Sequence, residues 1–269
     1  MLISEQLVSR LKALGLPMEE PAERLQGGDM SQVCRMGRFV IKEAIGAADD
    51  QLKIEAAGLK RLQNAGCKTP SIHHVDQSCL VMDYVSPGPA QEDDLAEQLA
   101  RLHTHTVAMD EPAQAIYIGN LRLEPTKPCT RWRDFWVTQR IAPLLELTDA
   151  QLGSRRQGLE RLLHTYEPPV EGPCVLHGDL WNGNVIYGQH GACLVDPSVW
   201  VGERGVDLAM MKLFGGFGAR FWQAYESNAP IPKAVQDALP FYQLYYLLVH
   251  VHFFGSSYIG PIDRIIERY

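Results

Sequence analysis

Apolar side chains recur along the chain with two different spacings. Residues 3–14 repeat apolar positions every three or four residues, which predicts a helix that ends at Gly15. Residues 49–63 carry a second stripe of this kind. Short apolar runs around this stripe predict strands, at 33–36, 38–42, 72–75 and 78–82. The first part of the chain is therefore expected to form a small sheet packed with helix.

Helical spacing dominates the remainder of the chain. The predicted helices cover 93–106, 131–147, a segment from Leu152 to Leu163, one opened by Asp207, 218–227 and 233–254. Residues 110–130 contain several prolines and predict irregular structure. A short strand ending at Leu176 and a hairpin of 185–187 with 192–195 interrupt the helices.

A change of composition after Val85 marks the best candidate for a boundary between two lobes. An apolar strand runs here into Ser-Pro-Gly-Pro, and Pro and Gly interrupt regular structure. We therefore expect an N-terminal lobe over 1–85 and a C-terminal lobe over 86–269.

Polar side chains are concentrated between His177 and Asn184, directly after the strand that ends at Leu176. The stretch reads His-Gly-Asp-Leu-Trp-Asn-Gly-Asn and has the H-x-D-x-x-x-x-N spacing of a kinase catalytic loop. Asp179 could accept the proton of a substrate hydroxyl or orient it. The hairpin that follows would return Asp196 close to Asn184, so that both could hold Mg²⁺ on the phosphates of a nucleotide.

Each of these residues has an ordinary structural explanation when it is taken alone. Asp179 could be a turn or capping aspartate, which is common. That explanation does not account for the joint spacing of His177, Asp179, Asn184 and Asp196, so we favour a catalytic site. We expect His177 to fix the loop by hydrogen bonding rather than to act as the base.

The first lobe holds candidates for binding nucleotide phosphates. Lys42 ends the strand Phe-Val-Ile-Lys, in the manner of the lysine-bearing strand of kinases, and Glu55 on the next helix could pair with it. Gly27 and Gly28 form either a plain hairpin turn or a loop whose N–H groups cover a polyphosphate. Taken separately, a solvated lysine, an exposed glutamate and a hairpin turn are the more common outcomes.

Four residues near the catalytic stretch have two possible roles each. Trp181 could stack on a sugar or simply pack, and we weigh these equally. Arg204 could pair with a carboxylate, neutralise a phosphate or lie exposed on the surface. Asp207 could cap a helix or anchor the catalytic loop, and we favour a structural role. His250 lies on the aromatic last helix and is a further candidate for substrate contact.

Composition narrows the choice of partners. The chain has 269 residues, of which 46 % are hydrophobic, and a formal net charge of −7. This charge disfavours nucleic acid as a partner, because a phosphate backbone needs a basic surface. The six cysteines form no CxxC pair and indicate buried thiols in a reduced compartment. Without a signal peptide or an apolar run approaching the roughly 18 residues of a membrane span, we expect a cytoplasmic protein.

Three segments resemble one family within the small-molecule kinases. These are His-Gly-Asp-Leu-Trp-Asn-Gly-Asn at 177–184, Val-Asp-Pro-Ser at 195–198 and Val-Asp-Leu-Ala-Met-Met-Lys-Leu-Phe-Gly-Gly-Phe at 206–217. The first two are shared with aminoglycoside phosphotransferases and choline kinases, whereas the third, with the loop tryptophan, is more specific. Together they resemble the fructosamine-3-kinase (ketosamine-3-kinase) family.

The resemblance implies an α+β, bilobal protein-kinase-like fold, with a small antiparallel-sheet N-lobe carrying one helix and a mainly helical C-lobe. It also implies transfer of the γ-phosphoryl group of ATP, with Mg²⁺, to the 3-hydroxyl of a ketosamine, in protein deglycation. By position, Asp179 would be the base, Asn184 and Asp196 the metal ligands, and Lys42 with Glu55 the pair that positions the phosphates. The adenine hinge would be Asp83, Tyr84 and Val85.

Departures from the expected pattern leave other functions open. Gly178 replaces the arginine of the protein-kinase H-R-D motif, so control by activation-loop phosphorylation is not expected. The segments Tyr117-Ile-Gly-Asn and Gly202-Glu-Arg-Gly also differ from the family, where substrate could bind. The alternatives are a phosphotransferase for an aminoglycoside, choline or another amino-alcohol, and a pseudokinase that only binds nucleotide.

Overall fold

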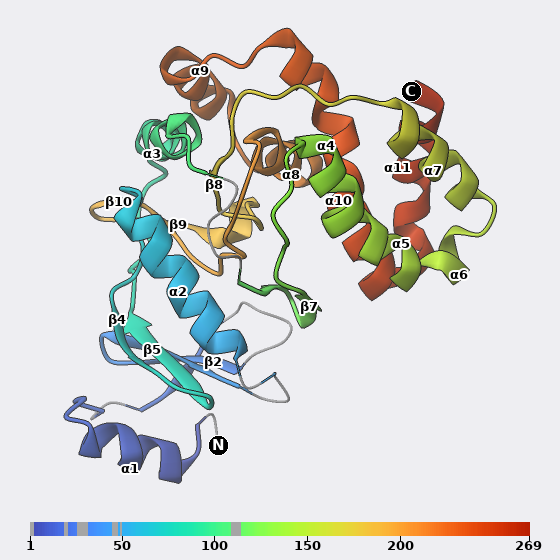
Figure 1. The fold of residues 1–269 in the computed structure, drawn as a ribbon. Coiled ribbons are helices and arrows are strands. Elements are labelled where there is room, and N and C mark those ends of the chain that lie inside the picture. The colour runs from blue at the N-terminus through green and yellow to red at the C-terminus, as the bar shows by residue number, and fades with distance from the viewer. Residues whose placement is uncertain (1–2, 19–20, 26–31, 45–47, 49, 109–113) are drawn as a thin grey trace.

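The N-terminal part of the chain forms an antiparallel sheet in this computed structural model, which describes residues 3–18, 21–25, 32–44, 48, 50–108 and 114–269. The strands lie in the order β1-β2-β3-β5-β4. Their bounds are β1 Glu23–Arg24, β2 Gln32–Met36, β3 Phe39–Glu43, β4 Ile72–Val75 and β5 Cys79–Asp83. Two helices, α1 (Glu5–Ala13) and α2 (Gln51–Asn64), accompany the sheet (Figure 1).

Each face of this sheet is covered by one of these helices. Leu7 and Leu11 of α1 pack with Ile41 and Val81 on one face. On the other face, α2 residues pack against Leu80 and Met82 of β5. Strand β5 is buried because neighbouring side chains alternate between two covered faces. The lobe therefore has one helix more than the single helix implied by the family resemblance.

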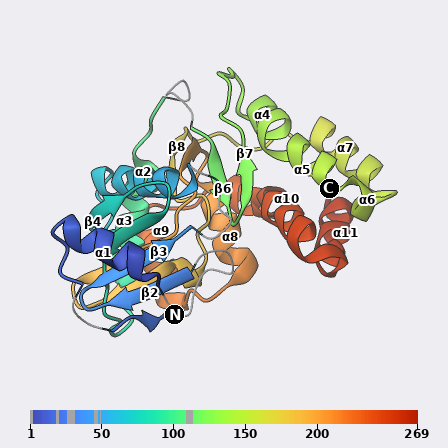
Figure 2. The ribbon, with the colours of Figure 1, turned by 90° about the horizontal axis from the view of Figure 1, so that it is seen from below.

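The C-terminal part is mainly helical. The helices are α3 Glu92–Thr104, α4 Trp132–Phe135, the π-helix η1 Trp136–Ile141, α5 Ala142–Leu147, α6 Asp149–Leu152, α7 Arg155–Thr165, α8 Gly205–Phe214, α9 Ala219–Asn228, α10 Lys233–Phe254 and α11 Ile259–Arg268, with 3₁₀ turns at Asn182–Asn184 and Gly255–Tyr258. Their apolar sides share one core, to which the buried α8 and α10 contribute most of their length. Helices α4 to α7, α10 and α11 gather on one side of the molecule, whereas α3 and α9 lie close to the N-terminal elements (Figure 2).

Short strand pairs complete the C-lobe. Strands β8 (Cys174–Leu176) and β11 (Trp200–Gly202) pair with each other, as do β9 (Val185–Gly188) and β10 (Gly191–Leu194). The expectation of irregular structure over 110–130 is wrong in part, since β6 (Ile116–Ile118) and β7 (Leu121–Leu123) form a hairpin there. The helix α11 was also not predicted. Together these elements give the expected bilobal, protein-kinase-like α+β architecture.

The β6–β7 hairpin fastens the C-lobe to the start of helix α2. The Tyr117 hydroxyl donates to the Asp50 carboxylate at 2.6 Å, and the Gln51 amide donates to the Gly119 carbonyl at 2.8 Å. Arg122 lies 3.5 Å from the same Asp50 carboxylate. The segment that departed from the family at the sequence level thus connects the lobes.

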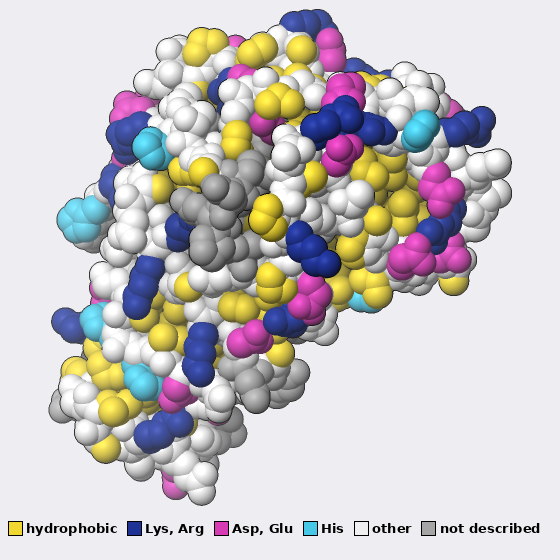
Figure 3. Space-filling view, viewed as in Figure 1, with side chains coloured by type: hydrophobic (Ala, Val, Ile, Leu, Met, Phe, Trp, Pro, Cys, Tyr) yellow, Lys and Arg dark blue, Asp and Glu magenta, His cyan; other side chains and the backbone are white. Residues whose placement is uncertain are grey.

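The described surface shows no concentration of one charge in the view of Figure 3, where basic and acidic side chains are interspersed. In the part of the chain that the structure describes, no helix is long and apolar enough to cross a membrane.

We predict that Tyr117→Phe lowers the free energy of unfolding by about 1 kcal/mol, because it removes one hydrogen bond to a carboxylate that is partly exposed. Urea denaturation would measure the difference. Tyr258→Phe serves as a matched control, because that hydroxyl has no hydrogen bond among the described residues, and it should change stability by less than about 0.5 kcal/mol. Equal losses for both variants would contradict a specific fastening role.

Candidate active site

The catalytic stretch lies where the expected strand, turn and hairpin meet. Strand β8 is fully buried and ends at Leu176, after which the chain turns through His177 to the 3₁₀ turn at Asn182–Asn184. The β9–β10 hairpin then pairs Val185 with Leu194. Beyond the hairpin, the Val195 N–H donates to the Asn184 carbonyl at 3.0 Å. The hairpin thus returns the chain to Asn184 directly before Asp196, as the spacing predicted.

Asp179 and Asn184 are in direct contact. The Asn184 side-chain amide donates to the Asp179 backbone carbonyl at 2.8 Å and to its carboxylate at 3.3 Å. This arrangement orients the amide so that its Oδ1 is left for another partner. Burial, followed by the nearby charge of Asp196, raises the pKa of Asp179 from 3.8 to about 7. A carboxyl group with a pKa near neutrality is suited to exchange a proton with a hydroxyl.

The backbone of the catalytic loop is anchored by Asp207 from helix α8. Its buried carboxylate accepts the His177 N–H at 2.7 Å and the Gly178 N–H at 2.9 Å. His103 of α3 contacts the same carboxylate at 3.3 Å and the Tyr225 hydroxyl at 2.9 Å. The structural role favoured for Asp207 from the sequence is therefore observed, as an anchor of the loop and not as a helix cap.

His177 fixes the loop from within. Its Nε2 lies 3.0 Å from the Val195 carbonyl, and its Nδ1 accepts the Asp179 N–H at 3.3 Å. Burial lowers the pKa of His177, which favours the neutral ring. Gly178 next to it has φ +81°, and a Cβ there would collide with the Ser198 carbonyl oxygen. The loop therefore requires glycine at the position that carries arginine in protein kinases.

Lys42 joins both lobes through two carboxylates. Its Nζ lies 2.8 Å from Glu55 and 2.7 Å from Asp196. Burial alone would lower the pKa of Lys42, but the two carboxylates raise it, so the ammonium stays charged. Asp196 has φ +51°, the left-handed conformation, which no other non-glycine residue among those described adopts. Such strain is characteristic of functional sites.

The proposed hinge continues the sheet into the linker before α3. The Tyr84 N–H donates to the Arg38 carbonyl at 2.8 Å, and the Asp83 N–H donates to the Ser71 carbonyl at 2.9 Å. Among the described residues, the Val85 N–H has no hydrogen-bond acceptor. Gly27 and Gly28 lie outside the described residues, so the structure does not address the phosphate-covering loop.

The three substrate candidates have different surroundings. Trp181 is 45 % exposed, and its ring lies against Gly183, where it would collide with any Cβ. His250 is half-buried, with its Nδ1 2.7 Å from the Tyr246 carbonyl and its ring 4.6 Å from that of Phe214.

Arg204, by contrast, is buried inside the C-lobe. Its guanidinium donates to the Glu171 carboxylate at 2.6 Å and 2.9 Å, and to the Ala229 and Pro230 carbonyls. It therefore pairs with a carboxylate, which was one of the roles considered. These partners assign it to the structure of the C-lobe, and we no longer regard it as a substrate residue.

Other side chains that support the loop were missed at the sequence level. The Tyr246 hydroxyl donates to the Gly178 carbonyl at 3.1 Å, and His103 supports the loop through its contact with Asp207. Tyr246 occurs in a run of apolar and aromatic residues typical of a core helix, so no pattern distinguishes it. The contact is formed only by the packing of α10 against the loop.

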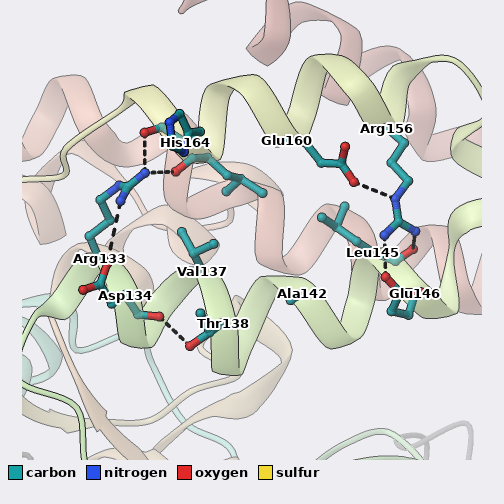
Figure 4. A pocket seen from close by; sticks show the side chains of 11 residues that line it. Arg133, Asp134, Val137, Thr138, Ala142, Leu145, Glu146, Arg156, Glu160 and His164 are labelled. Atoms are coloured by element: carbon teal, nitrogen blue, oxygen red, sulfur yellow. Dashed lines mark hydrogen bonds and ion pairs between the residues drawn. The ribbon is translucent and has the colours of Figure 1, made fainter.

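The groove drawn in Figure 4 lies elsewhere in the C-lobe and has a volume of about 370 Å³. It separates η1 and α5 from α7, with Val137, Leu145 and Leu163 among its apolar lining. Arg156 at one end pairs with Glu160 and Glu146. Its charged groups thus neutralise one another, and we assign no reaction to it.

The fold and the site together define a protein-kinase-like phosphotransferase. The chain superposes on an ADP-bound aminoglycoside phosphotransferase, APH(2″)-Ib, with a TM-score of 0.62 and 14 % identity, covering 98 % of each chain. That likeness concerns the fold alone. A crystal structure from Thermobifida fusca, named "putative fructosamine-3-kinase", has a TM-score of 0.84 and 28 % identity, covering 100 % of this chain and 98 % of the other.

Within this class the chain belongs to the fructosamine kinase family, whose model matches residues 5–269. It is 45 % identical over 262 residues to the "probable ketoamine kinase" of Thermus thermophilus, covering 96 % of this chain and 97 % of that relative. The family is one of ATP-dependent phosphotransferases, which confirms the kinase prediction.

We predict that Asp179 makes the stability of the ligand-free protein depend on pH. Between pH 3.8 and about 7 the folded state holds a proton that the unfolded state has released. The free energy of unfolding should therefore fall as pH rises through this window. Asp196 and Asp207 reinforce the shift, while Asn184 and Lys42 oppose it.

Asp179→Asn should remove this component, so that the variant gains stability relative to the wild type as pH rises from 4 to 7. Urea denaturation at several pH values, without nucleotide or divalent cations, would measure it. A constant difference between the two proteins across this range would contradict the assignment.

Proposed function

We propose that the protein transfers the γ-phosphoryl group of ATP, with Mg²⁺, to the 3-hydroxyl of a ketosamine such as a fructosamine or ribulosamine adduct. The observation that carries the proposal is the joint placement of Asp179, Asn184 and Asp196 with the Lys42–Glu55 pair. A protein that only binds nucleotide has no need for all five, which argues against a pseudokinase.

Asp179 would orient the acceptor hydroxyl and take its proton. The hydroxyl oxygen then forms a bond to the γ-phosphorus, the bond from that phosphorus to the β–γ bridging oxygen breaks, and ADP leaves with the bond's electron pair. The raised pKa of Asp179 supports this role, since a base near neutrality both accepts and later releases a proton. The contact from Asn184 holds the carboxylate in the loop.

The side chains at the end of the hairpin fit a magnesium ion. The Asn184 side-chain nitrogen donates to Asp179, so that its carbonyl oxygen is left for a metal ion. The Asp196 carboxylate accepts from Lys42 through Oδ1 alone. Two oxygen donors match the preference of Mg²⁺, which otherwise keeps waters and substrate phosphates as ligands. When bound, the ion would neutralise charge developing on the phosphates.

The N-lobe would hold the nucleotide. Glu55 keeps Lys42 in position to contact phosphates. The Val85 N–H, which has no acceptor among the described residues, would be available to an adenine edge at the hinge. We keep Asp83, Tyr84, Gly27 and Gly28 as proposed nucleotide-binding residues. The boundary after Val85 then separates the nucleotide-binding lobe from the catalytic lobe.

The acceptor would lie against the C-lobe side of the loop. The exposed Trp181 ring offers a flat face for a sugar, and His250 lies beside the Phe214–Gly216 segment that packs on Asn182. The relatives named as ketoamine kinases support a sugar-amine acceptor, for which deglycation is the proposed biological role. The free cysteines fit our proposal that it takes place in the cytoplasm.

Incubation with ATP, Mg²⁺ and a ribulosamine or fructosamine should yield a phosphorylated adduct, detected by phosphorus NMR at the 3-position. The matched control is the corresponding sugar without the amine, which should react far more slowly. Turnover of aminoglycosides or choline in place of every ketosamine would contradict the acceptor and leave the phosphotransfer intact.

We predict that Asp179→Asn lowers kcat by about 10²- to 10⁴-fold, because it removes the base, while ATP affinity changes little. Asp196→Ala should instead abolish Mg²⁺-dependent nucleotide binding. Calorimetric titration with a non-hydrolysable ATP analogue would separate the two effects. Full activity of Asp179→Asn would show that another group, or none, acts as the base.

A further inference from the structure

An arginine without a counter-charge is buried close to the catalytic loop. Arg140 of η1 is 1 % exposed, and among the described residues no carboxylate pairs with it. The hydrogen bond of its guanidinium runs from Nη1 to the Gln139 carbonyl at 3.3 Å, while Nε has no partner. Burial lowers the pKa of Arg140 to about 10, so it stays protonated at neutral pH. The charge is therefore retained in the interior against the rings of Phe135 and Trp200, with no carboxylate among the described residues to pair with it.

Further buried polar atoms have no hydrogen-bond partner among the described residues. They are the indole nitrogens of Trp136 and Trp200 and the hydroxyls of Tyr245 and Ser198. The Arg140 guanidinium lies 4.5 Å from the Trp200 ring, and the rings of Trp136 and Trp200 are 6.2 Å apart. Tyr245 contacts both indole rings, at 5.6 Å and 6.3 Å. We call these five residues the Arg140 cluster.

All five residues of the Arg140 cluster can donate hydrogen bonds. The two indoles and the guanidinium can only donate hydrogen bonds, and the two hydroxyls can donate as well. Buried donors are almost always paired in native proteins, so several in one place need an explanation. Trp132, which stacks on Trp200, has its indole nitrogen paired with the Tyr242 hydroxyl at 3.0 Å. A neighbouring indole N–H in the same aromatic core is therefore hydrogen-bonded within the protein, unlike those of Trp136 and Trp200.

The Arg140 cluster adjoins the catalytic loop. A Cβ on Gly178 would meet the Ser198 carbonyl and would lie 3.0 Å from the Trp200 ring. Tyr246, whose ring is 5.0 Å from that of Tyr245, donates to the Gly178 carbonyl. Burial and, to a lesser extent, the charge of Asp179 raise the pKa of Tyr245. A ligand in the cluster would thus lie next to the loop that carries the proposed base.

We propose that the Arg140 cluster is a binding site for a small anion, and that the carboxylate of the acceptor occupies it during turnover. A carboxylate has only acceptor oxygens and matches the forked donors of a guanidinium. The assignment of the anion to the acceptor's carboxylate rests on the proposed function. It specifies ketosamines of free α-amino acids as the substrate class. The opposite side of η1 lines the groove of Figure 4 through Val137 and Thr138.

The first experiment tests binding without turnover. Sodium formate is the probe, compared with sodium perchlorate at equal ionic strength, and the readouts are tryptophan fluorescence and the melting temperature. Formate should shift both in the wild type and neither in Arg140→Met. Arg133→Met is the matched control, because its guanidinium binds backbone carbonyls at the end of α7 and should leave the formate response intact. If Arg140→Met fails to fold, Trp136→Phe removes one donor and keeps an aromatic ring at this position.

The second experiment identifies the source of the anion. The acceptors are the ketosamines of glycine and of methylamine, which differ by the carboxylate alone. Arg140→Met should raise KM for the glycine adduct at least about tenfold and leave that for the methylamine adduct unchanged. Equal KM values, together with a formate response, would assign the site to an anion from solution and overturn the acceptor clause.

The outcomes separate this proposal from the proposed function. No formate response in the wild type, with equal effects of Arg140→Met on both acceptors, would overturn the anion site. Failure of the wild-type protein to phosphorylate either ketosamine would instead contradict the proposed function. The formate experiment remains decisive in that case, because it needs no turnover.

Discussion

The ion-pair triad of Lys42, Glu55 and Asp196 is the interaction on which the rest of the site depends. Its three members come from β3, from α2 and from the end of the β9–β10 hairpin, so it joins the sheet, its helix and the C-lobe. Because the ammonium is buried, losing either carboxylate would leave a charge with too little compensation. The position of α2 therefore decides whether Glu55 reaches Lys42, and the β6–β7 hairpin secures the start of this helix through Asp50 and Gln51.

Most of this arrangement could be predicted from the sequence because local patterns encode it. The stretch from His177 to Asn184, a hairpin of fixed length and Asp196 must come together once the strands pair. Lys42 and Glu55 follow in the same way from a strand beside a helix. The β6–β7 hairpin was missed because prolines around it obscured its short strands. The partners of Arg204 were equally out of reach, since Glu171 and Pro230 are brought to it only by tertiary packing.

The Arg140 cluster shows a second limit of sequence reasoning. Trp132, Phe135 and Trp136 have the spacing of a core helix, and they do pack in the core. What the spacing cannot reveal is that some polar atoms of such residues find partners while others do not. Trp132 and Trp136 differ in this respect although they share a helix turn. The difference is visible only when the hydrogen bonds of each buried atom are examined.

The glycine at position 178 determines how the conformation of the loop from His177 to Asn184 can be maintained. A side chain here would collide with the Ser198 carbonyl, so the loop cannot present the arginine by which protein kinases read a phosphorylated activation loop. The loop is held instead by contacts internal to the C-lobe, from Asp207, from the His177 ring and from Tyr246. Each is buried and independent of phosphorylation. The conformation of the loop is thus set by contacts within the C-lobe and requires no phosphorylated residue.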